Sequence, residues 1–132
     1  MSKTEEKFNN FVRIVEKLRS EEGCPWDRDQ TAGSLRRYLL EETQETLEAI
    51  NDNDPHHIKE ELGDLLYLIV LLSQIHHEKN LFNISEVIDE ISQKMVRRHP
   101  HVFEDKTFGS AEELRDQWLE IKRNEKSAKD KT

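Results

Sequence analysis

The chain has only one cysteine, Cys24, among its 132 residues. A single cysteine excludes an internal disulfide and favours a reducing compartment, so we expect a cytoplasmic protein. The first residues lack the apolar stretch of a signal peptide. The longest apolar run, residues 65–72, is too short to cross a bilayer. We therefore expect no membrane association.

Positive charge is also scarce, because 20 lysines and arginines face 28 aspartates and glutamates, for a net charge of -8. A general nucleic-acid-binding protein would be basic, so we expect no stable nucleic-acid binding. The same charge is compatible with a nucleotide held through metal ions. Charged residues make up 36% of the chain and hydrophobic residues 34%, a balance typical of a small helical protein with solvated outer faces.

Apolar residues recur at helical spacing, and no segment alternates convincingly as a strand would. The pattern predicts helices over residues 5–20, 31–50, 55–78 and 83–99, and a last one that opens at residue 110. Asp54 followed by Pro55 predicts the start of the third helix, and Ser110 with Glu113 forms a capping box for the last. We predict one all-α domain over residues 1–123, an antiparallel bundle of about five helices, and a charged, disordered tail over 124–132.

Four carboxylates lie on helix faces that are otherwise apolar. Glu42 and Glu45 interrupt the apolar stripe of the second predicted helix, and Glu61 and Asp64 interrupt that of the third. Helices joined by a short connection pack antiparallel, so the two pairs should meet. Buried carboxylates are costly unless they are paired or bind metal, and a hard divalent cation would satisfy all four.

The ligand types indicate which cation to expect. With oxygen ligands and no cysteine or histidine at ligand spacing nearby, Mg²⁺ or Mn²⁺ is favoured over Zn²⁺. A di-iron carboxylate bundle would need Glu-x-x-His on two helices, and the sequence contains none. A solvated, glutamate-rich pair of helix faces remains the structural alternative.

A basic cluster, Lys94, Arg97 and Arg98, falls on or beside the buried stripe of the fourth helix. The helix dipole alone favours such residues near a C-terminus. The functional interpretation is a phosphate clamp, since arginine forks match phosphate oxygens. An acidic metal site and a basic cluster in one small domain together indicate polyphosphate chemistry. Trp26 and Trp118 are most simply explained by core packing.

Several motifs in order resemble one family. The acidic pattern Leu39-Leu40-Glu41-Glu42-x-x-Glu45 followed by Glu61-Leu-Gly-Asp64 is similar to that of MazG-type nucleotide pyrophosphohydrolases. The segments Cys24-Pro25-Trp26-Asp27, Ser34-Leu35-Arg36-Arg37-Tyr38-Leu39 and Arg97-Arg98-His99-Pro100-His101-Val102-Phe103 resemble it too. The resemblance extends to about Lys122.

The resemblance implies an all-α, oligomeric enzyme that hydrolyses nucleoside triphosphates to monophosphate and pyrophosphate with Mg²⁺, in nucleotide-pool house-cleaning. It implies site residues by motif position: Glu42, Glu45, Glu61 and Asp64 as metal ligands, Lys94, Arg97 and Arg98 on phosphates, and Trp118 near the base. Glu41 belongs to the acidic motif as catalytic base or as an orienting residue. Some family members carry two such domains, and this chain has one.

Two alternatives stay open: an enzyme similar to phosphoribosyl-ATP pyrophosphohydrolase, and a non-catalytic helical module that only binds metal. Two predicted helices are apolar on opposite faces in a chain too small to enclose both. We therefore expect a homodimer or a dimer of dimers.

Overall fold

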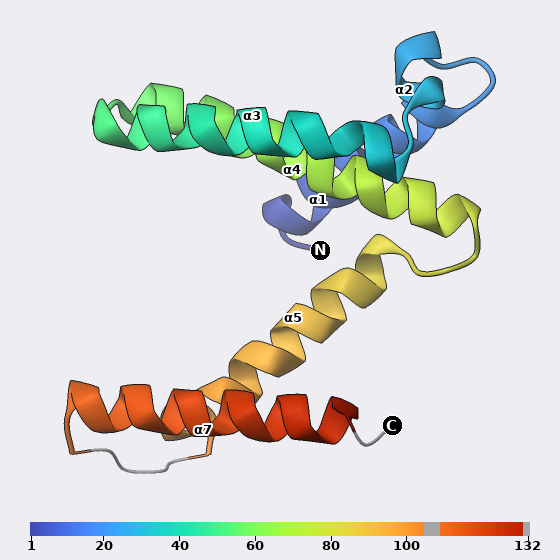
Figure 1. Ribbon diagram of the computed structural model, residues 1–132. Coiled ribbons are helices and arrows are strands. Elements are labelled where there is room, and N and C mark those ends of the chain that lie inside the picture. Colours follow the sequence, from blue (N-terminus) through green and yellow to red (C-terminus); the bar gives the residue numbers. More distant parts are fainter. Residues whose placement is uncertain (105–108, 131–132) are drawn as a thin grey trace. The chain divides into compact units, whose positions relative to one another are not determined.

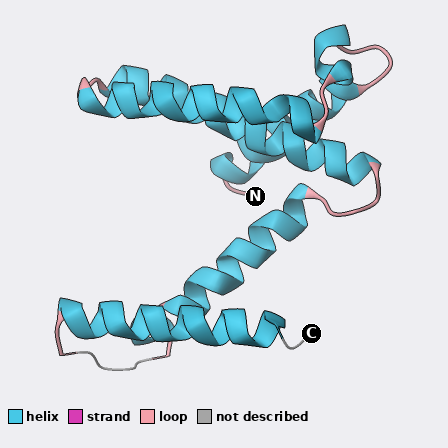
Figure 2. Ribbon diagram, viewed as in Figure 1, coloured by secondary structure: helices cyan, strands magenta, loops and turns pink. Residues whose placement is uncertain are grey.

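The computed structural model describes residues 1–104 and 109–130. Within these ranges it contains seven helices and no strand, which confirms the all-α prediction (Figures 1 and 2). The helices are α1 (Lys3–Arg19), α2 (Pro25–Asp29), α3 (Ala32–Asn51), α4 (Pro55–Glu78), α5 (Ile84–Arg98), α6 (Pro100–Phe103) and α7 (Ala111–Asp130). Five correspond to the predicted helices. The other two, α2 and α6, are too short to produce a readable periodicity.

The chain divides into two compact units, Met1–Ile84 and Ser85–Thr132. The region predicted as a single domain, residues 1–123, thus spans both units. Residues 124–130, which belong to the tail that the sequence predicted to be disordered, continue α7 in the structure. Residues 131–132 and 105–108, part of the predicted loop before α7, lie outside the described residues.

The first unit is built on the antiparallel pair α3 and α4, with α1 packed on α4 and α2 on α1 (Figure 1). Asp54 caps α4 as predicted, because its carboxylate accepts a hydrogen bond from the backbone N–H of His56 at 3.1 Å. One hydrophobic core holds these helices together. Its buried members are Val15, Leu35, Leu68, Val70, Leu71 and Ile75.

The second apolar faces of α3 and α4, which the sequence predicted to be buried, are exposed in the single chain. They carry Leu40, Leu47 and Ile50 on α3 and Leu62, Leu66 and Ile69 on α4. Gly63 lies between Leu62 and Asp64, and a Cβ atom added there would meet no other atom within 4 Å. Six large apolar side chains on two packed helices form more exposed apolar surface than monomeric proteins usually retain.

The second unit contains most of α5 together with α6 and α7. Pro100 ends the run of α5 and begins α6, and it is the one buried residue among those described in this unit. At the start of α7 the Ser110 hydroxyl accepts from the Glu113 N–H at 3.2 Å, and the Glu113 carboxylate accepts from the Gly109 N–H at 2.7 Å. The Ser110 half of the predicted capping box is therefore confirmed. Nowhere in the described part of the chain is a helix both long and apolar enough to cross a membrane.

Candidate metal and nucleotide site

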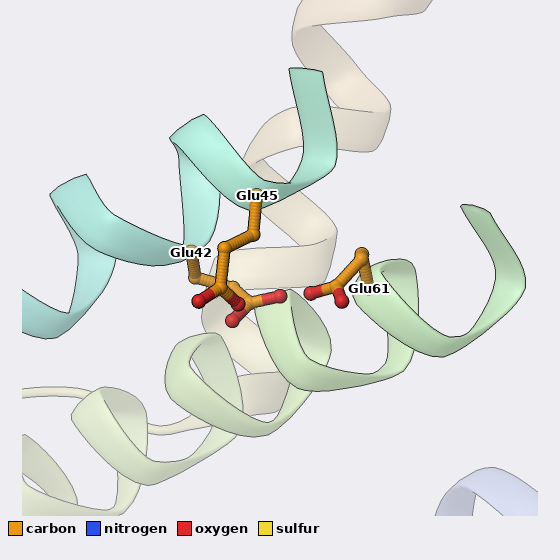
Figure 3. A group of neighbouring side chains, drawn as sticks. All are labelled: Glu42, Glu45 and Glu61. Atoms are coloured by element: carbon orange, nitrogen blue, oxygen red, sulfur yellow. The ribbon is translucent and has the colours of Figure 1, made fainter. Parts of the chain in front are cut away.

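Three of the four predicted metal ligands converge between α3 and α4. One carboxylate oxygen from each of Glu42, Glu45 and Glu61 lies within 4.8 Å of the others. Figure 3 shows Glu42 and Glu45 pointing from α3 toward Glu61 on α4. The spacing of three residues between Glu42 and Glu45 places both on one face of α3, and the short connection to α4 returns the chain so that Glu61 faces them.

Partial burial distinguishes this cluster from a solvated acidic face, because Glu61 is buried and Glu42 half-buried, whereas Glu45 is exposed. Glu61 is only 6% exposed, and its Oε1 lies 3.2 Å from Nε2 of His57, one turn earlier on α4. Its Oε2 and Oε1 of Glu42 are buried, with no hydrogen-bond partner among the described residues. Buried acceptors without donors are costly. A divalent cation with oxygen ligands would satisfy them, so these residues fit the metal that the family resemblance implies.

The raised pKa values of the cluster also indicate that it suits a bound cation. Burial, followed by the adjoining carboxylates of Glu61 and Glu45, raises the pKa of Glu42 to about 8. Asp64 and Glu61 add repulsion through their charges. Desolvation, with the charges of Glu61 and Glu60, also raises the pKa of Asp64. The site therefore favours protonation when it lacks a cation, and a cation would remove that preference.

A pocket opens beside the cluster, within the first unit. Its lining consists of Trp26, Tyr38, Glu41, Glu42, Glu45, Asp64, Tyr67 and Leu68. Asp64 thus lines the same pocket as Glu42 and Glu45, although it is not part of the closest group, whereas Glu61 belongs to that group but does not line the pocket. Glu41 also lines the pocket but is exposed, with its Oε1 3.9 Å from Nε of Arg37.

The predicted substrate-binding residues all lie in the second unit. Arg97 donates from Nε to Oε1 of Glu125 at 2.9 Å, and Arg98 donates from Nη2 to Oε2 of the same carboxylate at 3.1 Å. These bonds lower the pKa of Glu125 to about 2. Lys94, one turn before Arg98 on α5, is half-buried.

Trp118 lies beside this ion pair, with the Arg98 guanidinium 5.8 Å from its ring centroid. The two residues line a pocket of about 560 Å³ whose other lining residues are His99, His101, Leu114, Arg115, Leu119 and Lys122. Trp118 is 41% exposed in the single chain, so part of its indole is accessible from the pocket. A cationic pocket with an exposed indole suits an anionic, aromatic ligand.

Some residues at the acidic cluster and in the two pockets escaped the sequence analysis, although a signal was present for most of them. His57 precedes Glu61 by four residues and therefore lies on the same helix face. Arg115 and Lys122 stand three and four residues from Trp118. Trp26 belongs to the family-like segment Cys24-Pro25-Trp26-Asp27. No local spacing indicates its place in the acidic pocket, because that place depends on contacts made by α1 and α4.

The fold and the site define an all-α protein with a cluster of carboxylates between two antiparallel helices. Residues 30–103, more than half of the chain, match the family model described as the MazG nucleotide pyrophosphohydrolase domain. The chain belongs to this family.

Similar proteins are consistent with this assignment. The chain is 48% identical over 122 residues to the nucleoside triphosphate pyrophosphohydrolase/pyrophosphatase MazG of Thermotoga maritima, with 92% of this chain and 46% of the relative covered. It is 39% identical over 124 residues to the nucleoside triphosphate pyrophosphohydrolase of Escherichia coli K12, with coverage of 93% and 47%. The chain thus spans about half the length of these two curated relatives.

Two further matches differ in coverage. The uncharacterized protein YabN of Bacillus subtilis is 46% identical over 121 residues, which are 92% of this chain and 25% of the relative. The crystal structure of a mazG-related protein from Thermotoga maritima superposes with a TM-score of 0.71 at 29% identity, covering 87% of this chain and 98% of the other.

Proposed function

We propose that this protein hydrolyses nucleoside triphosphates to the nucleoside monophosphate and pyrophosphate in a metal-dependent reaction. The observation that carries the proposal is the convergence of Glu42, Glu45 and Glu61 around buried oxygens that lack donors. Family membership supplies the reaction, since relatives from Thermotoga maritima and Escherichia coli bear this activity in their names. The cellular role we propose is removal of unwanted nucleotides from the pool, in the cytoplasm.

The proposed metal ligands are Glu42, Glu45, Glu61 and Asp64, and the ion is Mg²⁺ or Mn²⁺. Such an ion would lower the pKa of a water molecule bound to it and would stabilise negative charge on phosphate oxygens. The chain contributes the geometry, because α3 and α4 fix the carboxylates before any ligand arrives. His57 contributes by holding Oε1 of Glu61, while the buried Oε2 has no hydrogen-bond partner among the described residues.

Glu41 is the proposed catalytic residue. It lines the pocket and is exposed, so its carboxylate is accessible to water and can accept a proton from it. Water attacks the α-phosphorus, the bond to the bridging oxygen breaks, and pyrophosphate leaves with that oxygen. A role for Glu41 in orienting the other acids remains the alternative.

The substrate-binding residues we propose are Lys94, Arg97 and Arg98 for phosphates and Trp118 for the base. Their support is motif position within the family and the cationic pocket that Arg98 and Trp118 line. The pocket beside the acidic cluster measures about 200 Å³, below the roughly 300–1,000 Å³ of pockets that enclose a drug-sized ligand. The first unit alone would therefore hold only part of a nucleotide.

A homodimer or a dimer of dimers is the proposed assembly. The exposed apolar faces of α3 and α4 support it, because a second copy of the same pair would cover them. The second unit adds to this support, since its described helices have almost no buried residues of their own.

The decisive experiment incubates the protein with Mg²⁺ and a panel of nucleoside triphosphates, and scores pyrophosphate against inorganic phosphate. We expect pyrophosphate and the monophosphate. Turnover of phosphoribosyl-ATP alone would indicate the related enzyme class, and no turnover of either would indicate a metal-binding module. Glu61→Gln should abolish turnover, whereas Glu16→Gln, which changes an exposed glutamate on α1, should retain most of it.

A further inference from the structure

We propose that His57 is a positioning residue that sets the cation preference of the acidic cluster, because it leaves Glu61 a single oxygen with which to bind a metal ion. The inference rests on the proposed function and concerns which cations its metal site accepts. A carboxylate that offers one oxygen suits Mg²⁺ and Mn²⁺, which prefer a compact octahedral set of ligands. Ca²⁺ takes a larger set of oxygens and often both oxygens of one carboxylate, so the same restriction disfavours it.

His57 is the basic partner of the acidic cluster. Its Nε2 lies 3.2 Å from Oε1 of Glu61, and Nε2–H donates, since an ionised carboxylate only accepts hydrogen bonds. In the described part of the chain, no other basic side chain forms an ion pair with Glu42, Glu45 or Glu61. Oε2 of Glu61 is buried and has no hydrogen-bond partner among the described residues. One oxygen of Glu61 is thus engaged, and the other is available to a cation.

The two side chains differ in burial, and the difference favours a positioning role. The side chain of Glu61 is 8% exposed and that of His57 is 38% exposed. A hydrogen bond to a carboxylate that is shielded from water is stronger than the same bond at the surface. His57 is not a member of the buried core, so replacing it removes this bond without opening a cavity among the apolar side chains.

The start of α4 holds His57 in place before any ion binds. The first turn of a helix has backbone N–H groups without partners inside the helix. Here Oδ1 of Asp54 accepts from the N–H of His56 at 3.1 Å and from that of His57 at 3.5 Å, and Pro55 occupies the first position of the helix. Glu61 follows His57 by four residues, which places both side chains on one face of α4. The orientation of Glu61 is therefore set by the first turn of its own helix.

Both oxygens of a carboxylate bind one ion only when both face it. For Glu61 that arrangement would set the ion in competition with His57 for Oε1, so binding through Oε2 alone is favoured. An octahedral ion accepts this single bond, whereas Ca²⁺ loses a ligand. Residues that hydrogen-bond metal ligands typically contribute roughly 10- to 100-fold to metal affinity. Removing His57 should therefore weaken Mg²⁺ and Mn²⁺ binding, and it should free Oε1 as an additional ligand for Ca²⁺.

The test measures metal binding directly, with Mn²⁺ as the probe. Electron paramagnetic resonance counts the free Mn²⁺, and Mg²⁺ and Ca²⁺ are titrated against it as competitors. In His57→Ala we expect the Kd values for Mn²⁺ and Mg²⁺ to rise roughly 10- to 100-fold. The Kd for Ca²⁺ should rise less, so that the preference for Mg²⁺ over Ca²⁺ falls.

Two further variants serve as rescue and control. His57→Gln keeps a side-chain N–H donor, so it should restore part of the preference for Mg²⁺. His56→Ala removes an exposed histidine from the same turn of α4 and should bind all three ions like the wild type. Melting curves with chelator identify a variant that fails to fold. If His57→Ala fails, His57→Leu, which keeps the bulk of the side chain without a donor, replaces it and should show the same change in preference.

Binding and hydrolysis are scored separately, so the two proposals fail in different ways. A wild type that binds Mn²⁺ but hydrolyses no nucleoside triphosphate overturns the proposed reaction and leaves the cation preference to be decided by the Kd values. A wild type that binds no Mn²⁺ overturns the metal site and this inference with it. If His57→Ala weakens Mg²⁺ and Ca²⁺ equally, or leaves both Kd values unchanged, only the role of His57 in cation preference is overturned.

Discussion

The carboxylate of Glu125 on α7 binds the guanidinium of Arg98 on α5, with 3.1 Å between Oε2 and Nη2. The side chains are 15% and 12% exposed, so the pair is largely shielded from solvent. Arg97 binds the other oxygen of the same carboxylate. Glu125 thus sets the position of two of the three proposed phosphate-binding residues, from a segment that the sequence predicted to be disordered.

Glu125→Gln should destabilise the fold in a pH-dependent way. The pKa of Glu125 is lowered to about 2 from 4.5, so the unfolded state binds the proton more readily. The stabilisation is present above about pH 4.5 and is lost as the pH falls toward 2. We expect a loss of about 1–2 kcal/mol at neutral pH, because Arg97 is half exposed and its share is screened. Melting temperatures of both proteins between pH 2 and 7 should converge at the acid end, and a constant difference would contradict the pairing.

Much of the fold could be predicted because its causes are local. Apolar spacing gave the five long helices, and Asp54 with Pro55 marked the start of α4, which the structure confirms. The acidic site was predictable for a related reason: Glu42, Glu45 and Glu61 interrupt stripes that local spacing makes visible. Their convergence then required only that two helices joined by a short turn pack together.

The remaining features depend on contacts between distant segments. Trp26 lies in a five-residue helix with no periodicity, and its place beside the acids follows from the hydrogen bonds that Arg19 and Tyr67 donate to Asp27. Residues 124–130 are polar except for Ala128, and Glu125 binds Arg98 and Arg97, which lie 27 and 28 residues earlier. Neither the place of Trp26 nor the ion pairs of Glu125 can be read from the spacing of residues within one segment.

Arg98→Ala should reduce turnover more than stability. Arg98 lies one turn past Lys94 on α5, and a lost charge-assisted bond to phosphate costs about 1.5–3 kcal/mol of transition-state stabilisation. The measurement is kcat/KM for a nucleoside triphosphate together with the melting temperature. The matched control is Glu125→Gln, which removes the charge that Arg98 binds but keeps Arg98 itself. Unchanged kcat/KM in Arg98→Ala would remove Arg98 from the phosphate-binding residues.

Charges placed on the exposed apolar faces should dissociate the assembly. Leu47→Glu on α3 and Leu66→Glu on α4 each place a carboxylate where a second copy would pack. Light scattering of the wild type at micromolar concentration should give a dimer or tetramer, and each variant should give a smaller species. Leu81→Glu, exposed but on neither face, should behave like the wild type. A monomeric wild type would contradict the proposed assembly.

Trp118 should report nucleotide binding by its fluorescence. Its indole lies beside Arg98 in the cationic pocket, so a bound base should change its emission. In Trp26→Phe, where Trp118 is the remaining tryptophan, adding nucleotide with Ca²⁺ should still change the emission. In Trp118→Phe the change should be smaller than in the wild type. A signal carried wholly by Trp26 would count against Trp118 as a base neighbour.

Asp64→Asn gives the sharpest test of the metal site, because it removes one charge at nearly constant shape. The pKa of Glu42 is raised from 4.5 to about 8, and that of Asp64 is raised as well. A raised pKa means that the folded state binds the proton more tightly than the unfolded state. The apo protein should therefore lose stability as the pH rises from about 4.5 toward 8. Asp64→Asn removes part of the repulsion, so with chelator it should melt at the same temperature as the wild type or higher at neutral pH.

With Mg²⁺ the wild type should melt at a higher temperature than Asp64→Asn. A ligand at 100 times its dissociation constant adds about 2.7 kcal/mol to the free energy of unfolding, and Asp64→Asn should weaken that gain because an amide oxygen is a poorer ligand than a carboxylate. The variant should therefore show a reduced Mg²⁺-induced rise in melting temperature and almost no turnover. Glu16→Gln removes an exposed charge on α1, outside the acidic cluster and the pocket lining, and should keep the full rise. If Asp64→Asn melts lower with chelator yet keeps the full rise with Mg²⁺, Asp64 is a structural hydrogen-bonding residue, and the ligand set reduces to Glu42, Glu45 and Glu61.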